Sequence, residues 1–325
     1  MIRWAILIAI LVTSVCLALR YGQISVPLDV LWNGLGTNDG PGSLILGTIR
    51  GPRVAVAMGG GFVLGLSGAL FQTLFRNPLA SPDVLGFTSG AGLAVIFAVS
   101  FNLAIAPTIA AVAGGVFAAL VVAAIAYQKG VETPAITLIL VGLGIGFFAT
   151  GLATFLMTVL PTSSALEAQR WLSGSLSGST WGNAGLVCGL GSLLALFALA
   201  QSRALGVLEL GNDMAKGLGL STEASRWTIS GTGVLLAAVG VSLTGPVPFV
   251  ALIAGPLGAV LSGATTVAGR LLAGGMAGAI VLVLADLVAR VAIPNTQLPA
   301  GVFTGLIGAP FLLWRLGVEM RKGRV

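Results

Sequence analysis

The stretch from Gln201 to Arg226 reads QSRALGVLELGNDMAKGLGLSTEASR and stands between two long apolar runs. Leucines and polar residues are interspersed along it, and glycines such as Gly211 and Gly217 interrupt the pattern. This arrangement predicts short amphipathic helices separated by turns, not another apolar span. The stretch is long enough to present a surface to a soluble partner protein.

Outside this insert the chain is strongly apolar. Hydrophobic residues make up 56% of its 325 residues and charged residues only 8%, whereas a soluble domain carries roughly 25% charged residues. The shortfall indicates an all-α integral membrane protein. The 48 glycines fit helices that pack closely through small residues. No segment has the composition of a second domain, so we expect one transmembrane domain over residues 1–325.

About ten apolar runs can cross a hydrocarbon core of ~30 Å, which takes ~20 helical residues. They cover residues 4–20, 53–75, 84–105, 107–127, 134–160, 183–200, 227–245, 247–267, 271–293 and 300–317. Residues 1–22 resemble a signal peptide, but the apolar run is long for one and no small-residue cleavage site follows it. We therefore expect an uncleaved first helix. Pro246, Pro248 and Pro256 should break or kink the eighth span.

Basic residues indicate how the spans are oriented, because cytoplasmic loops carry an excess of Lys and Arg. With an inner N-terminus, the inner side carries Arg3, Arg76, Lys129, Arg203, Lys216, Arg226, Arg270, Arg315, Arg321, Lys322 and Arg324. The outer side then carries Arg20, Arg50, Arg53, Arg170 and Arg290. This bias predicts that both termini and residues 201–226 are cytoplasmic.

The side chains that most catalytic chemistry needs are scarce. The chain has no histidine, and none of Lys129, Lys216 and Lys322 follows the glycine frame of a P-loop. Cys16 and Cys188 both lie in apolar runs, so a disulfide framework is not expected. The basic residues are scattered singly, which argues against a nucleic-acid surface. We expect no bound cofactor or metal and no enzymatic activity.

Asp286 is the one acid well inside an apolar run. An intramembrane acid is a candidate for a proton or ion relay, which would suit an ion-coupled secondary transporter. Arg290 follows four residues later and would lie on the same helix face, so a local ion pair near the outer end of the ninth span is the simpler interpretation.

Arginines also gather at the predicted outer surface, where Arg50 and Arg53 precede the second span and Arg290 ends the ninth. The planar guanidinium group suits carboxylates, so the three could receive acidic side chains of a docking protein. Alternatively, they only anchor helix ends at the headgroups. On the inner side, Arg76, Asn77 and Pro78 begin a proline-rich turn that either merely connects two spans or forms a joint docking surface with residues 201–226.

The motifs in order resemble the FecCD-type permeases, the membrane subunits of ABC importers for iron–siderophore chelates, haem and cobalamin. They are RGPR (50–53), GLSGALFQ (65–72), RNPLASPDVLG (76–86), WLSGS (171–175), the 205–220 insert, Gly245-Pro246, ADLVAR (285–290), LPAGV (298–302) and GAPF (308–311). The resemblance covers nearly the whole chain. Residues 67–73 and 81–87 look closest to the catecholate, enterobactin-like branch.

The resemblance implies a type II ABC importer bundle of ten helices per subunit. It also implies a second permease subunit, two cytoplasmic ATPases, a periplasmic or lipid-anchored binding protein and a ferric siderophore as cargo in the bacterial inner membrane. Haem or cobalamin is the alternative cargo. By motif, Arg50, Arg53 and Arg290 would meet acids of the binding protein. The coupling contacts with the ATPase would come from Leu205, Leu208, Leu210, Asp213, Met214, Lys216, Gly217, Leu218 and Gly219.

One departure from the family pattern lies in the eighth span. Many members have Pro-His or Pro-Gln there, with an arginine three residues later. This chain has Gly255, Pro256 and Ala259 instead. The change removes a polar and a cationic group, and a sister permease that retains the motif would be one remedy.

Overall fold

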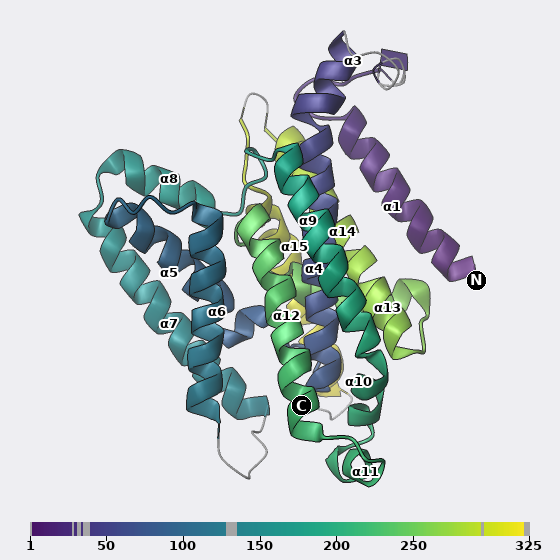
Figure 1. The fold of residues 1–325 in the computed structure, drawn as a ribbon. Helices are drawn as coiled ribbons and strands as arrows, with labels where there is room; N and C mark the ends of the chain where they lie inside the picture. The colour runs from purple at the N-terminus through teal and green to yellow at the C-terminus, as the bar shows by residue number, and fades with distance from the viewer. Residues whose placement is uncertain are drawn as a thin grey trace.

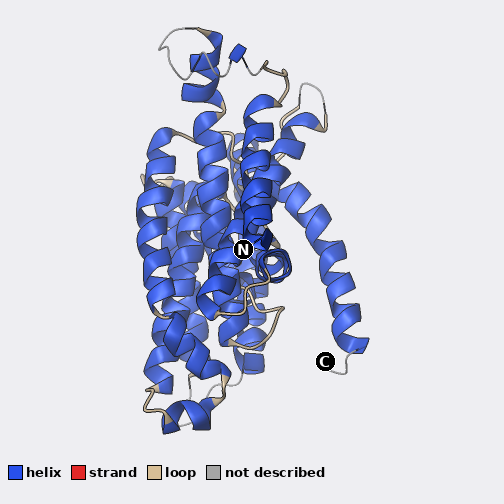
Figure 2. Ribbon diagram, turned by 90° about the vertical axis from the view of Figure 1, so that its right-hand side faces the viewer, coloured by secondary structure: helices blue, strands red, loops and turns tan. Residues whose placement is uncertain are grey.

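A computed structural model of the chain describes all residues except 1, 28, 31–33, 35–39, 128–134, 294–295 and 322–325 (Figure 1). Lys129, Lys322 and Arg324, used above for sidedness, therefore lie outside the described residues. Within the described part the regular structure is helical, and Figure 2 shows long helices running along one common direction. The predicted all-α class is confirmed.

Seven helices among the described residues are long and apolar enough to cross a membrane, counting α4 together with the turns that precede it. They are α1 (Ile2–Arg20), α4 (Gly51–Leu74), α6 (Pro107–Ala126), α7 (Ala135–Val159), α9 (Trp181–Ala200), α12 (Thr222–Thr244) and α14 (Val267–Val291). Three further apolar helices are α5 (Phe87–Ser100), α13 (Val250–Ser262) and α15 (Ala300–Arg321). Each of the ten predicted spans overlaps one of these ten helices.

The remaining helical segments are short and lie between the long ones. They are α3 (Pro41–Leu44), the π-helical turn η1 (Ile45–Ile49), the 3-10 turn η2 (Pro82–Leu85), α8 (Thr162–Leu172), α10 (Ser202–Glu209) and α11 (Asn212–Gly217). In Figure 1, α10 and α11 lie at one end of the bundle and α3 and α8 at the other. The amphipathic helices predicted from residues 201–226 are thus present.

Two predicted spans are longer than the helices that form. The eighth, expected over 247–267, is only α13, because Pro248 and the left-handed Phe249 (φ 66°) delay its start and Gly263 (φ 62°) ends it. The third, expected over 84–105, starts after η2 and the left-handed Gly86. The sequence predicts that the prolines interrupt the eighth span, whereas the left-handed conformations at Phe249, Gly263 and Gly86 follow from no apolar pattern.

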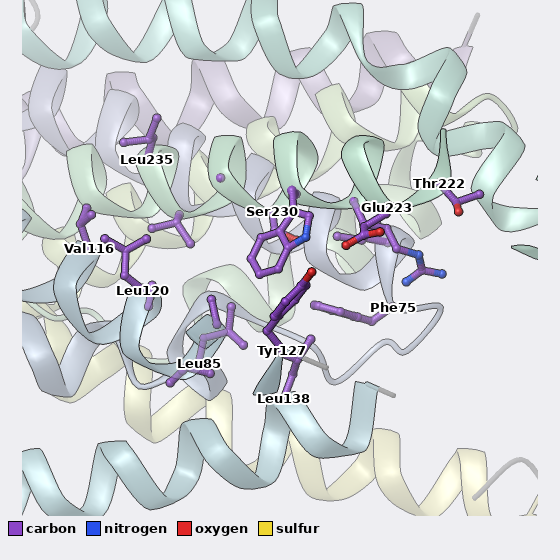
Figure 3. A pocket seen from close by; sticks show the side chains of 18 of the residues that line it. Phe75, Leu85, Val116, Leu120, Tyr127, Leu138, Thr222, Glu223, Ser230 and Leu235 are labelled. Carbon is purple, nitrogen blue, oxygen red and sulfur yellow. The ribbon is translucent and has the colours of Figure 1, made fainter. Parts of the chain in front are cut away.

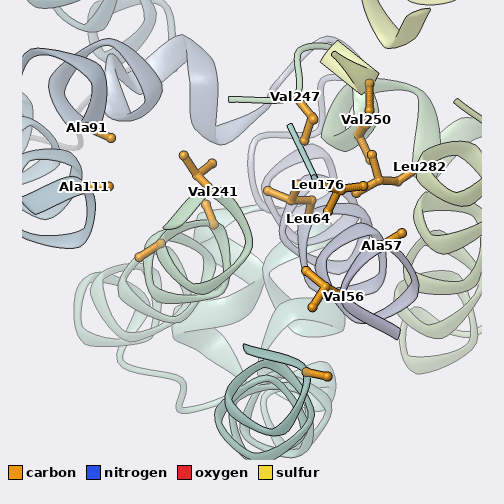
Figure 4. Close-up of a cluster of buried hydrophobic side chains, with 14 of the residues drawn as sticks. Val56, Ala57, Leu64, Ala91, Ala111, Leu176, Val241, Val247, Val250 and Leu282 are labelled. Atoms are coloured by element: carbon orange, nitrogen blue, oxygen red, sulfur yellow. The ribbon is translucent and has the colours of Figure 1, made fainter. Parts of the chain in front are cut away.

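Helix α4 is the centre of the bundle and packs against α14, α12, α13 and α9. Its most extensive contact is with α14, where a Cβ atom on Gly61 would lie 2.5 Å from the carbonyl oxygen of Gly278. Lipid offers helices no hydrophobic force to associate, so such close van der Waals packing must hold them together. Around this pair, Leu64, Val241 and Leu282 belong to a buried apolar cluster (Figure 4).

Helices α5, α6, α7 and α8 form a second group beside this centre (Figure 1). Helix α5 packs on α6 and α7, and α6 is the main contact of this group with α12. The bundle therefore consists of two helix groups that meet along α6 and α12.

Helix α13 contains the departure at Gly255 and Pro256. Pro256 has no N–H to donate to the carbonyl of Leu252 four residues earlier. The side chain of Gln72 on α4 fills this role, because its Nε2 donates to that carbonyl at 2.8 Å. A Cβ atom on residue 255 would lie 1.9 Å from Gln72 Oε1, so glycine at 255 makes room for the glutamine. Gln72 thus satisfies the backbone carbonyl that Pro256 leaves without a helical donor.

We expect Gln72→Met to lower the free energy of unfolding by about 1–3 kcal/mol, because it leaves the Leu252 carbonyl without a donor. Thermal denaturation of the detergent-solubilised protein would measure the change. Gln169→Met on the exposed surface of α8 is the matched control and should change stability little. In a Pro256→Ala background the backbone N–H of residue 256 can donate to the Leu252 carbonyl. Gln72→Met should then lower the free energy of unfolding by a smaller amount. An equal cost in both backgrounds would contradict this account.

Candidate functional site

The candidate site at the end of the bundle that the sequence predicts to face outward is built around one buried carboxylate. Asp286 lies in the last two turns of α14 and is 1% exposed. Arg53, in the first turn of α4, approaches it with Nε at 2.9 Å from Oδ1 and with a second guanidinium nitrogen at 2.8 Å. Arg290 places its Nε 3.1 Å from Oδ2. A single carboxylate therefore holds two guanidinium groups and joins α4 to α14.

This arrangement confirms the Asp286–Arg290 ion pair predicted from their spacing and adds Arg53 to it. Arg53 and Asp286 are 233 residues apart, so no local pattern could have paired them. The ion-relay interpretation of Asp286 finds no support in this geometry. A carboxylate that already accepts from two arginines serves as an anchor between helices.

Arg50 joins the same region by a different set of contacts. Its guanidinium group donates to the carbonyl oxygens of Leu19, Arg20 and Ile24, at and beyond the end of α1. Arg290 also donates to the carbonyl of Ala18 at 3.1 Å. These bonds satisfy carbonyl groups that the end of a helix leaves without partners.

The three arginines predicted to dock a partner lie together, but none is freely exposed. Arg50, Arg53 and Arg290 are 8%, 7% and 6% exposed, and each is hydrogen-bonded within the chain. Within this cluster three arginines face one aspartate, which leaves an excess of two positive charges among these four residues. The arrangement can attract an acidic partner, because positive charge at a surface steers negative charge toward it.

The candidate site at the other end of the bundle is residues 201–226, which include α10, α11 and the first turn of α12 and which we call the coupling segment after its predicted role. Leu205 and Leu208 are buried in a cluster with core residues such as Leu74, so they attach the segment to the bundle. On the opposite surface Met214 and Leu218 are 61% and 63% exposed. The exposed residues of the predicted set are Leu210, Asp213, Met214, Lys216, Gly217, Leu218 and Gly219.

Two polar contacts hold the coupling segment in place. Glu209 at the end of α10 forms a 2.6 Å ion pair with Arg270 in the first turn of α14. Arg226 on α12 donates to the side-chain oxygen of Asn212 at 2.8 Å. Through Arg270, the coupling segment is connected to the helix that carries Asp286 and Arg290 at its other end.

The turn after α4 lies near this end of the bundle. Arg76 is exposed with φ 50°, and the side chain of Asn77 accepts a hydrogen bond from the backbone N–H of Leu79. This Asx-type bond and the following Pro78 stabilise a defined turn. Farther on, burial raises the pKa of the Asp83 carboxyl, and a hydrogen bond from Thr88 opposes part of that rise.

Comparisons with known proteins agree with this architecture. The model of the FecCD transport family matches residues 10–317. The ferric enterobactin transport system permease protein FepG of Escherichia coli (strain K12) is 34% identical over 98% of each chain. The vitamin B12 import system permease protein BtuC of Yersinia enterocolitica is 32% identical over 95% of this chain and 91% of its own.

A solved structure is also similar along its whole length. It is an inward-facing conformation assigned to a metal-chelate type ABC transporter, with a TM-score of 0.84 and 27% identity over 99% of both chains. The family model, the relatives and the solved structure all match nearly the entire chain. The chain therefore belongs to the FecCD transport family.

Proposed function

We propose that this chain is the permease subunit through which a ferric siderophore, of the catecholate type, crosses the bacterial inner membrane. The family is one of transport permeases of ABC importers, so the chain is a multi-pass membrane protein and not an enzyme. The observation that carries the choice of cargo is the match to FepG over 98% of both chains. A vitamin B12 permease matches almost as far, so cobalamin is the second candidate.

Three kinds of partner complete the proposed importer. Two ATPase subunits receive the exposed apolar surface of the coupling segment, and a second permease subunit completes the pathway. A binding protein presents acidic side chains to the excess positive charge near Arg50, Arg53 and Arg290. The Lys and Arg bias supports an arrangement with both termini and the coupling segment in the cytoplasm.

The contacts suggest how ATPase closure reaches the outer face. Movement of α10 would pull on α14 through the ion pair between Glu209 and Arg270. Helix α14 packs tightly on α4, so the two would move as one body. The far end of α14 carries Asp286 and the proposed docking residue Arg290, beside Arg50 and Arg53. A displacement at the inner face would thus change the surface on which the binding protein sits.

Transport in proteoliposomes tests the cargo. The chain, purified with the permease, ATPase and binding protein that copurify with it, should take up a ferric catecholate siderophore only when ATP is inside. A ferric hydroxamate siderophore and cobalamin, offered at equal concentration, serve as matched controls. We expect ATP-dependent uptake of the catecholate and little of the other two. Preferred uptake of cobalamin would move the chain to the second candidate, and uptake driven by a proton gradient without ATP would contradict the proposal.

A further inference from the structure

A groove of about 530 Å³ lies at the meeting of the two helix groups, between α6 and α12 (Figure 3). Its floor is apolar and buried, and it includes Leu74 and Val122. Its sides include Leu120 on α6 and Leu235 on α12, which are exposed. The volume falls within the range of roughly 300–1,000 Å³ that ligand pockets occupy. Both helices are of membrane-spanning length and apolarity, so the hydrocarbon core would cover this opening.

One end of the groove is polar and aromatic. Tyr127, after the end of α6, and Trp227, in the second turn of α12, have ring centroids 6.3 Å apart. Lys216 and Arg226 lie at the same end, with Glu223 as the one acid among the lining residues that the structure describes. The hydrogen bond from Arg226 to Asn212 holds its guanidinium group at the mouth. Tyr and Trp with basic residues at a helix end are typical of the membrane–water interface.

We propose that this groove binds one phospholipid with an anionic headgroup. The acyl chain lies along the apolar floor, and the phosphate is held at Lys216 and Arg226. Among the described lining residues two cations stand against one acid, which favours a negatively charged headgroup. A hydrophilic chelate does not suit the apolar floor, which offers it few hydrogen-bond partners. The lipid would fill the seam between the two helix groups next to the coupling segment.

Gly231 on α12 provides a direct way to fill the groove. It lines the groove, and no heavy atom lies within 4 Å of a Cβ atom placed on it. A leucine there would extend into the space of the proposed acyl chain without displacing the backbone. Gly189 on α9 is also exposed and has an equally open Cβ position, and it is not among the residues that line the groove. Gly189→Leu is therefore the matched control for Gly231→Leu.

Quenching of Trp227 fluorescence tests the acyl chain. A variant retains Trp227 alone, with the five other tryptophans of the chain replaced by phenylalanine. It is purified with phosphatidylglycerol that carries brominated chains, and then diluted into excess unbrominated phosphatidylcholine. We expect part of the quenching to persist after the surrounding lipid has exchanged. This persistent part should vanish in Gly231→Leu and remain in Gly189→Leu.

Native mass spectrometry supplies a second measurement that keeps all tryptophans. The protein with its natural tryptophans, released from mixed phosphatidylglycerol and phosphatidylcholine, should retain one phosphatidylglycerol per chain. Gly231→Leu should lose it, and Lys216→Gln with Arg226→Gln should remove the preference for the anionic lipid. The proposal would be overturned if the fluorescence recovered completely and equally fast in all variants and if native mass spectrometry found no retained lipid. A detergent molecule or a protein segment found in the groove instead would also overturn it.

Discussion

Asp286→Ala is expected to lower the free energy of unfolding by about 3–5 kcal/mol, the usual cost of leaving a buried charge without its partner. The substitution would strand two guanidinium groups, because Arg53 and Arg290 both bond to this carboxylate and are nearly buried themselves. The contact between the outer ends of α4 and α14 would loosen. Thermal denaturation in detergent and the yield of folded protein would measure the loss.

Two controls make this test specific. Glu167→Ala removes an exposed acid on α8 and should change the free energy of unfolding by less than about 0.5 kcal/mol. Replacing Asp286, Arg53 and Arg290 together by leucine and methionine removes all the charges at once and should cost far less than Asp286→Ala alone. If Asp286→Ala were as stable as the unmodified protein, the carboxylate would not be the anchor inferred here.

A second substitution at the same position, Asp286→Asn, separates anchoring from docking. If the arginines attract the acids of a binding protein, folded Asp286→Asn protein carries one more net positive charge and should bind the loaded binding protein at least as tightly. Weaker binding by the folded variant would show instead that Asp286 positions the arginines for the partner. The affinity of the immobilised variant for the binding protein can be measured at low and at high salt, since salt screens contacts between charged residues.

Replacing both Met214 and Leu218 by aspartate is expected to abolish recovery of the ATPase subunits with this chain. Both side chains are more than half exposed on the coupling segment. Burying an apolar side chain of this size contributes about 1.5–3 kcal/mol, so losing two weakens the affinity by about a hundredfold or more. Copurification and ATP-driven uptake in proteoliposomes measure the effect.

Two comparisons sharpen this second test. Leu166→Asp changes an equally exposed leucine on α8, at the opposite end of the bundle, and should leave the ATPases bound (Figure 1). Glu209→Gln breaks the ion pair with Arg270 but keeps the exposed surface. It should retain the ATPases and lower the amount of cargo carried per ATP hydrolysed. Full uptake by the Met214 and Leu218 variant would contradict coupling through this segment.

The features that could be predicted from the sequence depend on residues close to one another in the chain. Runs of apolar residues marked the ten spans, because a helix must be apolar over ~20 residues to cross a bilayer. The polar and leucine-rich pattern of 201–226 predicted amphipathic helices, and α10 and α11 are present. The spacing of four between Asp286 and Arg290 predicted their ion pair, since such residues share a helix face.

Contacts between distant residues were decided only by the tertiary structure. Arg53 reaches Asp286, Glu209 reaches Arg270, and Gln72 compensates for the missing N–H of Pro256. Each pair joins helices far apart in the chain, and for Arg53 and Asp286 the meeting depends on how the glycine-rich surfaces of α4 and α14 pack. The periodicity of one helix predicts which of its faces is apolar and which is polar. It does not predict which other helix that face will contact, because in lipid many apolar faces are equally able to pack.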